Sequence, residues 1–261
     1  MAFAQAQSRP IPGAVATVGV SQRVAFLRRT YAHLGAALIA WAALTAYFLL
    51  GQSELSWKLS AWVYTGSLRF FIVLALFMLV GVVAQRLAQS DTSRGVQYGG
   101  LALAIIAEAV ILQPLLWKAM IVTGSYRFAG FDRLPIATGG GDAGALILQA
   151  ALLTAVIFVG LTLTVFLTRK DFSFLRGTLV VCSFAALGII VASLAFGFSL
   201  GVFFVGAMIL LMAGYILYQT SEVMAHFPPS HHVAAALMLF STIATLFWYV
   251  LQLLMSLRGN D

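Results

Sequence analysis

A single carboxylate stands near the middle of a long apolar segment, LAIIAEAVILQPLLW, in which Glu108 has aliphatic neighbours on both sides. An ionised carboxylate is very unfavourable in hydrocarbon, so this side chain must be protonated, paired or exposed to water. Pro114, six residues further on, leaves the carbonyl of Val110 without its usual helical donor. Carboxylate and carbonyl oxygens are the ligands of hard cations such as Ca²⁺. The pattern indicates either a cation site or a neutral acid bonded to a neighbouring helix beside a structural kink.

Uncharged polar side chains mark two further apolar segments. Gln219 ends one of them, in GYILYQTSEV, and Gln252 follows Trp248 and Tyr249 in the next. If the two segments adjoin as helices, these side chains are expected to form a neutral polar cluster near the inner face of a membrane. We therefore take Glu108, Gln219, Tyr249 and Gln252 as candidates for lining an ion pathway.

No enzyme signature accompanies these residues. The sequence has no HExxH, no GxSxG and no paired aspartates within its apolar segments. His226, His231 and His232 lie in MAHFPPSHHV with a spacing that fits no standard metal-ligand pattern, which favours a solvated loop that titrates with pH. We expect neither catalysis nor a resident cofactor, and only transient binding of a cation such as Ca²⁺.

The amino-acid composition indicates whether water or lipid surrounds these segments. Of 261 residues, 62% are hydrophobic and 9% are charged, and the mean hydropathy is +0.99. Too little polar surface remains to keep a soluble domain of this size dissolved. The net charge of +7 comes from Lys and Arg at the ends of apolar runs, and no basic face interleaved with aromatics argues for nucleic acid. The composition predicts an all-α polytopic membrane protein in a lipid bilayer.

Seven apolar runs are long enough to cross a bilayer as helices. They cover roughly residues 31–50, 68–87, 97–116, 145–167, 174–196, 200–218 and 233–257. Residues 1–25 mix small residues, proline and glutamine, which predicts a flexible cytoplasmic tail. Residues 26–258 are then one seven-helix transmembrane domain, and residues 259–261 form a C-terminal tail.

Basic residues predict the orientation of these spans. With the N-terminus inside, nine Lys and Arg fall in inner segments: Arg9, Arg23, Arg28, Arg29, Arg86, Arg94, Arg169, Lys170 and Arg176. Six fall in outer segments: Lys58, Arg69, Lys118, Arg127, Arg133 and Arg258. This excess predicts a cytoplasmic N-terminus and an external C-terminus.

The outer segments carry aromatic residues and a long loop. Trp57, Trp62 and Tyr64 in the first outer loop, and Trp117 at the end of the third span, are typical of the aromatic belt at a membrane interface. Residues 123–144, TGSYRFAGFDRLPIATGGGDAG, predict a long flexible loop. Their three consecutive glycines lack the preceding strand and the following GK[ST] of a nucleotide-binding loop.

Several segments together resemble the Bax inhibitor family, also called the transmembrane Bax-inhibitor-motif family, and its bacterial YccA-like branch. QAALLTAVIFVGLTLTVFLTRKDFSFLRGTL, residues 149–179, is similar to the fourth span of that family and to the basic turn that follows it. FLRRTYAHLGAAL resembles the entry to its first span, AEAVILQPLL its third-span motif and GYILYQTSEV the exit of its sixth span. The similarity runs in order from about Val24 to Arg258.

The resemblance implies seven transmembrane helices, six of them around a central seventh, and a proton-sensitive calcium leak. In the family, two facing aspartates near the cytoplasmic ends of the sixth and seventh helices share a proton and control the leak, with an arginine on the second helix as their partner. Gln219 stands in place of the first aspartate, Tyr249 (or Trp248 in a shifted register) matches the second, and Arg86 stands near the arginine. Because Gln219 cannot titrate, a gate of that kind cannot operate here.

Two other acids lie close to the same end of the spans. Glu222 is one turn nearer the cytosol than Gln219, and Asp171 lies in the turn between the fourth and fifth spans. Either could substitute for a missing aspartate. Ordinary interfacial charge is the favoured interpretation of both, with Asp171 bonded to a nearby arginine or to the start of the next helix.

Two functions follow from the resemblance. The first is a Bax-inhibitor-like cation (calcium) leak pathway that lacks the usual di-aspartate pH sensor. The alternative is a YccA-like regulatory partner or modulator of the membrane-bound ATP-dependent protease FtsH, which the missing acidic pair and the loose N-terminal tail favour. The same branch implies the inner (cell) membrane of a bacterium as the location.

Overall fold

The computed structural model describes residues 15–17, 19–90, 93–168 and 170–258. Its α-helices are α1 (Val20–Ala46), α2 (Ser53–Tyr64), α3 (Ser67–Ala88), α4 (Arg94–Ile111), α5 (Gln113–Val122), α6 (Ala143–Thr168), α7 (Leu175–Phe196), α8 (Val202–His226) and α9 (His232–Arg258). Short helical turns at Val15–Thr17, Tyr47–Gly51 and Pro229–His231 adjoin α1 and α9. Strands β1 (Tyr126–Arg127) and β2 (Ile136–Ala137) form one antiparallel pair.

Seven helical segments are long and apolar enough to cross a membrane, which confirms the predicted polytopic all-α fold. They are Val20–Gly51, Ser67–Ala88, Arg94–Val122, Ala143–Thr168, Leu175–Phe196, Val202–His226 and Pro229–Arg258. The first span begins earlier than predicted, and the third and sixth end later. The added turns are polar or amphipathic. They were not predicted because the spans were identified from uninterrupted apolar residues.

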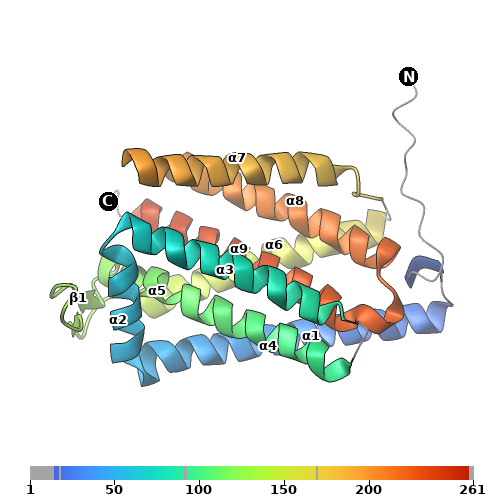
Figure 1. Ribbon diagram of the computed structural model, residues 1–261, viewed down its shortest axis with the longest axis horizontal. Helices are drawn as coiled ribbons and strands as arrows, with labels where there is room; N and C mark the ends of the chain where they lie inside the picture. Colours follow the sequence, from blue (N-terminus) through green and yellow to red (C-terminus); the bar gives the residue numbers. More distant parts are fainter. Residues whose placement is uncertain (1–14, 18, 91–92, 169, 259–261) are drawn as a thin grey trace.

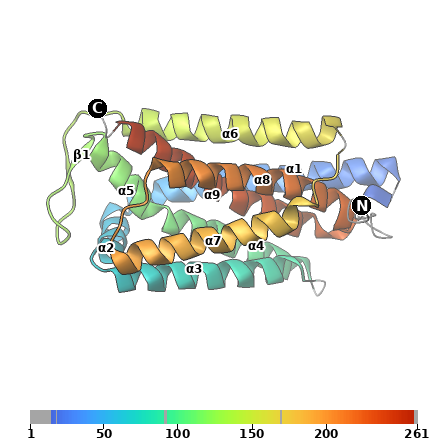
Figure 2. The same cartoon turned by 90° about the horizontal axis from the view of Figure 1, so that it is seen from above.

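The spans lie side by side along the long axis of the molecule, and α2 crosses one end of them (Figure 1). In Figure 2, α6 and α3 form opposite edges, with α8 and α9 between them. Helix α9 is the most buried span. Within the most apolar 18-residue stretch of each span, 72% is buried in the span of α9 and 6% in α3. It packs against α1, α3, α4, α5, α6 and α8, whereas α7 packs against α8. Helix α9 is thus buried among other spans, and the arrangement of six helices around a central seventh stays a prediction.

The two ends of the bundle differ in construction. Helices α1, α4 and α9 all begin at one end, which we call the inner end after the predicted orientation. Helix α2, the β1–β2 pair and α5 lie at the opposite, outer end (Figure 1). The first outer loop was not predicted to be helical. Its short amphipathic segment becomes α2 because it packs against α5 and α3.

This packing corrects part of the aromatic-belt prediction. Trp57 on α2 and Trp117 on α5 are 3% and 1% exposed, and their rings meet edge to face with centroids 5.4 Å apart. They are core residues that join the two helices. Trp62 and Tyr64 are exposed, as residues of an interfacial belt would be.

Residues 123–144, predicted as a flexible loop, fold into a short hairpin around β1 and β2. Gly141 has a left-handed backbone (φ 80°), and a Cβ there would lie 2.4 Å from the backbone nitrogen of Ser125. Only glycine fits at this close crossing of the two ends of the loop. The backbone N–H of Thr138 also donates to the carbonyl of Ser125 at 3.2 Å.

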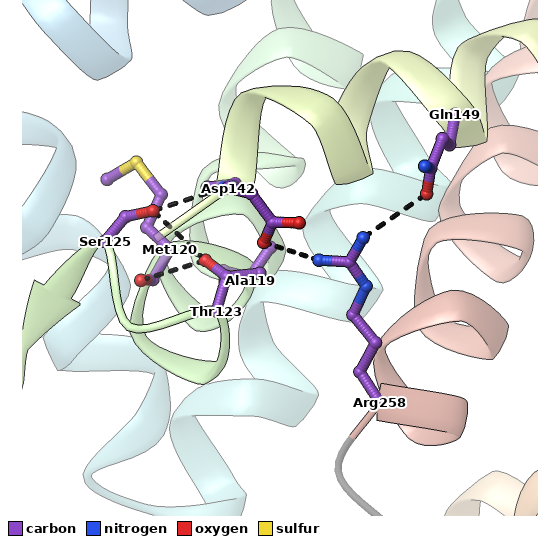
Figure 3. Close-up of polar contacts among 8 residues, drawn as sticks. Ala119, Met120, Thr123, Ser125, Asp142, Gln149 and Arg258 are labelled. Carbon is purple, nitrogen blue, oxygen red and sulfur yellow. Dashed lines mark hydrogen bonds and ion pairs between the residues drawn. The ribbon is translucent and has the colours of Figure 1, made fainter. Parts of the chain in front are cut away.

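The same loop is tied to the outer ends of α6 and α9 (Figure 3). Arg258, in the last turn of α9, forms an ion pair with Asp142 at 2.5 Å. Its second guanidinium nitrogen donates to the side chain of Gln149 on α6 at 3.5 Å. The side-chain oxygen of Ser125 accepts from the backbone N–H of Ala143 at 3.2 Å. These contacts fix the loop against the membrane domain.

The end of the predicted N-terminal tail is also attached to the bundle. Val15 is fully buried in a small cluster with Phe26, Val223 and Ala235. Its backbone N–H donates to the carbonyl of Phe227 at 3.0 Å. Residues 1–14 and the C-terminal tail, residues 259–261, lie outside the described residues.

A close helix crossing gives a direct test of this packing. A Cβ added at Gly100 on α4 would lie 2.5 Å from the carbonyl oxygen of Ala84 and 2.7 Å from the backbone nitrogen of Ala88 on α3. Gly100→Ala should therefore force α3 and α4 apart and lower the free energy of unfolding by about 1–3 kcal/mol. Thermal unfolding in mild detergent measures this change.

The adjacent glycine provides the matched control. A Cβ at Gly99 would have no atom within 4 Å, so Gly99→Ala should leave stability unchanged or raise it slightly. Equal loss of stability in the two variants would contradict the described α3–α4 crossing.

Candidate functional site

Glu108 points into the bundle and not toward lipid. It is 8% exposed and lies on the buried face of α4 together with Gly100, Leu101 and Ala104. Helix α4 packs against α1, α3 and α9. Among the described residues, the carboxyl group of Glu108 has no hydrogen-bond or ion-pair partner. A buried carboxyl group without a protein partner must be neutral or be neutralised by something that binds there.

Two side-chain contacts between α1 and α4 define the depth of Glu108. His33 Nε2 and the Tyr98 hydroxyl lie 2.8 Å apart near the inner end, and Gln113 Nε2 donates to the carbonyl of Thr45 at 3.4 Å near the outer end. Glu108 lies ten residues beyond Tyr98, or about 15 Å along α4 at 1.5 Å per residue. This distance is about half of a bilayer core of about 30 Å. The carboxyl group thus lies near the middle of the membrane.

Two unpartnered polar atoms of α1 lie at similar depth. Trp41 is eight residues beyond His33, and Thr45 one turn further. The indole N–H of Trp41 and the hydroxyl of Thr45 are both buried, with no hydrogen-bond partner among the described residues. Buried polar groups are nearly always paired. Both groups lie at about the depth of Glu108, counted along α1.

Gln219 is hydrogen-bonded to a residue that the sequence did not single out. Thr242 on α9 donates from its hydroxyl to the side-chain oxygen of Gln219 on α8 at 2.8 Å, and both side chains are buried. Thr242 lies ten residues beyond His232, again about 15 Å from the inner end. Trp41, Glu108, Gln219 and Thr242 therefore share one depth, and we call them the polar layer.

The expected cluster of Gln219 with Tyr249 and Gln252 does not form in the described structure. Helices α8 and α9 are antiparallel with Gln219 opposite Thr242. Tyr249 and Gln252 are seven and ten residues further along α9, about 10 Å and 15 Å toward the outer end. Both are half-buried. The residue that faces Gln219 is thus Thr242, and neither Tyr249 nor Trp248.

Arg86 lies away from the polar layer. It is in the last turn of α3 at the inner end and is exposed. It forms no ion pair within the part of the chain that the structure describes. The positive charge of Arg86 interacts favourably with the partial negative charge at the C-terminus of α3. This interaction explains a basic residue at this position without any role in a gate.

The kink near Pro114 is present but leaves no free carbonyl. The helix is interrupted at Leu112, between α4 and α5, and Pro114 lies in the first turn of α5. The backbone N–H of Leu112 donates to the carbonyls of Glu108 and Val110. Gln113 Nε2 donates to the carbonyl of Ala109 at 2.8 Å. The predicted ligand from Val110 is therefore already engaged in a hydrogen bond.

A hydrogen-bonded network closes the bundle on the outer side of the polar layer. Ser56 on α2 donates to the side-chain oxygen of Gln113 at 2.8 Å, and the indole of Trp117 donates to Ser56 at 2.9 Å. The hydroxyl of Tyr64 donates to the carbonyl of Pro114 at 2.7 Å. Ser56, Gln113 and Trp117 are each at most 2% exposed. Helix α2 thus covers this end of the bundle.

Apolar packing closes the inner side. Between His232 and the polar layer, α9 carries Val233, Leu237 and Phe240, which are all fully buried or nearly so. The ring of Phe240 meets that of Trp41 edge to face, with centroids 6.0 Å apart. The bundle is therefore closed on both sides of Glu108. Apolar side chains pack on the inner side, and the hydrogen-bonded network lies on the outer side.

Glu222 and Asp171 have local partners at the inner end. Glu222 pairs with His226 one turn along α8 at 3.1 Å, so His226 is not part of a free solvated loop. Asp171 is exposed and accepts the backbone N–H of Ser173 at 2.9 Å, just before α7. Neither acid lies in the polar layer. Their interpretation as ordinary interfacial charge stays a prediction.

Comparison with known proteins identifies the fold family. A family model described as "Inhibitor of apoptosis-promoting Bax1" matches residues 134–259, which cover α6 to α9. An uncharacterized protein of Pseudomonas aeruginosa is 34% identical over 156 residues, which is 58% of this chain and 70% of that protein. The chain belongs to the Bax inhibitor family.

Eukaryotic members of the family extend the similarity over most of the chain. Bax inhibitor 1 of Schizosaccharomyces pombe is 26% identical over 254 residues, covering 95% of this chain and 82% of the yeast protein. Protein LIFEGUARD 3 of Arabidopsis thaliana is 29% identical over 223 residues, covering 78% of this chain and 87% of the plant protein. The family-model match includes Gln219 and Thr242 but not Glu108. The arguments about Glu108 therefore rest on its position in this structure.

Proposed function

We propose that the protein provides a passive pathway for a cation, most naturally Ca²⁺, through the core of the bundle. The observation that carries this proposal is Glu108, a carboxyl group in mid-membrane that lies on the buried face of α4 and has no partner among the described residues. Intramembrane acids of this kind are costly, and they commonly mark ion or proton pathways. A bound cation would offset the cost of burying the ionised carboxylate.

The other oxygen atoms of the polar layer suit the same class of ligand. The hydroxyl of Thr242 and the amide oxygen of Gln219 lie at the depth of Glu108. Together they offer one charged and two neutral oxygens, which hard cations prefer. A single negative charge, with no described cation to neutralise it, favours a positive ion over an anion in this part of the bundle.

Conduction requires the closed conformation to open at both seals. The inner seal is apolar packing around α9, and the outer seal is the hydrogen-bonded contact of α2 with α5. Because Gln219 and Thr242 do not titrate, their contact is not expected to act as a proton-controlled switch. We therefore propose a slow leak without the di-aspartate pH sensor of the family.

Calcium uptake by liposomes tests this function. Liposomes that carry the full chain and an enclosed calcium-sensitive dye should take up Ca²⁺ faster than protein-free liposomes and liposomes with heat-denatured protein. Between about pH 5 and about pH 8, uptake should change only with the ionisation of Glu108, without the steeper change that a carboxylate pair would impose. Uptake equal to that of protein-free liposomes throughout this range would contradict the proposal.

A role as regulatory partner of the protease FtsH stays a prediction from the YccA-like resemblance. The N-terminal tail that favoured it falls, up to residue 14, outside the described residues. Co-purification from membranes in mild detergent distinguishes the two functions. A protease that remains bound to a chain without calcium uptake would favour the regulatory role.

A further inference from the structure

Two adjoining cavities at the inner end are lined by residues that the proposed cation pathway does not use. They have volumes of about 300 Å³ and 280 Å³, and both are lined by Arg29, Arg94, Gln97 and His232. Ser93, Pro229 and Ser230 complete the first, and His33 and Tyr98 complete the second. The volume is at the lower end of the range of small-ligand sites. Helices α1, α4 and α9 each contribute to the walls.

The charges at these cavities have one sign. Arg29 and Arg94 each carry a fixed positive charge, and neither forms an ion pair with a described residue. No carboxylate is among the described residues that line either cavity. The described acids at the inner end are Asp171 and Glu222, and Glu222 is already paired with His226. Two guanidinium groups held at one cavity, with no counter-charge among the described residues, favour the binding of an anion.

Two helix N-termini add to this positive field. Helix α4 begins at Arg94, with Ser93 as its capping residue, and α9 begins at His232. Each helix has 18 or more residues, so each terminus carries its full partial positive charge. Ser93, Arg94 and His232 all line the larger cavity. The helix dipoles and the arginines therefore act on the same space.

Hydrogen bonds within the walls hold the site in shape. His33 Nδ1 donates to the carbonyl of Arg29 at 2.7 Å, which leaves Nε2 facing the Tyr98 hydroxyl at 2.8 Å. The ring of His33 also meets the ring of His232 edge to face, with centroids 5.0 Å apart. Gln97 Nε2 donates to the carbonyl of Ser90, just beyond α3, at 2.9 Å and so joins α4 to this residue. The basic side chains thus belong to helices that contact one another, and not to independent loops.

We propose that this inner basic pocket binds a phosphate group, as a monoester or diester. Arginine pairs and helix N-termini are the usual partners of phosphate oxygens, and both are present here. The pocket lies at the inner end of the spans, so the phosphate can belong to an anionic phospholipid headgroup or to a free phosphate in the cytosol. Either source supplies the same group to Arg29 and Arg94.

Binding to the delipidated full chain in a non-ionic detergent separates these sources. The probes are dioctanoyl phosphatidylglycerol, dioctanoyl phosphatidylcholine and inorganic phosphate, at constant ionic strength, and native mass spectrometry counts the bound molecules. Retention of phosphatidylglycerol over phosphatidylcholine identifies a lipid headgroup as the ligand. Retention of inorganic phosphate with no preference for phosphatidylglycerol identifies a free phosphate. Retention of none of the three would overturn the proposal.

Variants test whether the pocket itself is responsible. Arg29→Gln and Arg94→Gln should each weaken binding of the retained probe about tenfold, since a hydrogen bond to a charged group is worth about 1.5–3 kcal/mol. Arg28→Gln is the matched control, because Arg28 is exposed next to Arg29 and lines neither cavity. An equal loss in all three variants would show general attraction to a basic surface and would contradict a built site.

Discussion

Replacing the Gln219–Thr242 contact with two aspartates should make calcium uptake depend on pH. In Gln219→Asp/Thr242→Asp, two carboxyl groups would occupy positions whose side chains now approach to 2.8 Å. At acidic pH the pair can share one proton and keep α8 and α9 together. At alkaline pH both groups ionise and repel one another, which should loosen the contact and raise the leak.

The expected rise is about tenfold between about pH 5 and about pH 8, which corresponds to about 1.4 kcal/mol of repulsion. Initial rates of calcium uptake by liposomes, measured at both pH values, give this ratio. The wild-type ratio should be smaller, because neither Gln219 nor Thr242 titrates and Glu108 is the one titrating member of the polar layer.

The matched control places the second aspartate at Tyr249, the position that the family resemblance matched to it. Gln219→Asp/Tyr249→Asp adds the same two acids, but Tyr249 lies about 10 Å further along α9 than Thr242. These carboxyl groups cannot share a proton, so uptake should vary little with pH. A control that responds as strongly as Gln219→Asp/Thr242→Asp would contradict the register that the structure gives to α8 and α9.

Removing the charge of Glu108 should reduce calcium uptake by about tenfold or more. Glu108→Gln keeps the size and shape of the side chain but replaces an anionic ligand with a neutral amide. A contact with a charged group is worth about 1.5–3 kcal/mol, which is a tenfold change or more in occupancy of the site. Uptake by liposomes with equal amounts of protein measures the loss.

Stability separates this effect from misfolding. Because Glu108 has no described partner, the amide should not weaken the bundle, and the unfolding temperature in detergent should stay the same or rise. Glu222→Gln is the matched control, since Glu222 is also partly buried but lies at the inner end beside His226. It should leave calcium uptake near the wild-type rate. Equal losses in both variants would argue for a general effect of charge on insertion.

The seven spans could be predicted from the sequence because each is an uninterrupted apolar run of bilayer length. Helix α2 could not be predicted in the same way. Its twelve residues include Lys58 and Glu54, and its burial depends on the contact of Trp57 with Trp117, sixty residues away in the chain. Periodicity within a short segment does not reveal such a partner.

The candidate site was predicted in part for a similar reason. The isolated position of Glu108 in an apolar run was enough to mark it, and its inward direction agrees with the cost of exposing a carboxyl group to lipid. Thr242 was missed because a threonine in an apolar helix usually bonds to its own backbone. Its contact with Gln219 depends on the length of the turn between α8 and α9, from Phe227 to His231, which sets the register of the two helices.

The basic pocket was missed because its residues are scattered along the chain. Arg29, Arg94 and His232 belong to three helices, and each looks like ordinary positive charge at the inner end of a span. Only the packing of α1 against the N-terminal ends of α4 and α9 brings these side chains to one cavity.

Calcium uptake by liposomes carrying the wild-type chain, beside liposomes carrying Glu108→Gln at the same protein density and pH, tests the role of Glu108 most directly. If the carboxylate binds a cation inside the bundle, uptake by wild-type liposomes should exceed uptake by protein-free liposomes. The Glu108→Gln variant should then lose most of this excess. Wild-type uptake that Glu108→Gln leaves unchanged, or that never exceeds the protein-free rate, would contradict a cation pathway through this residue.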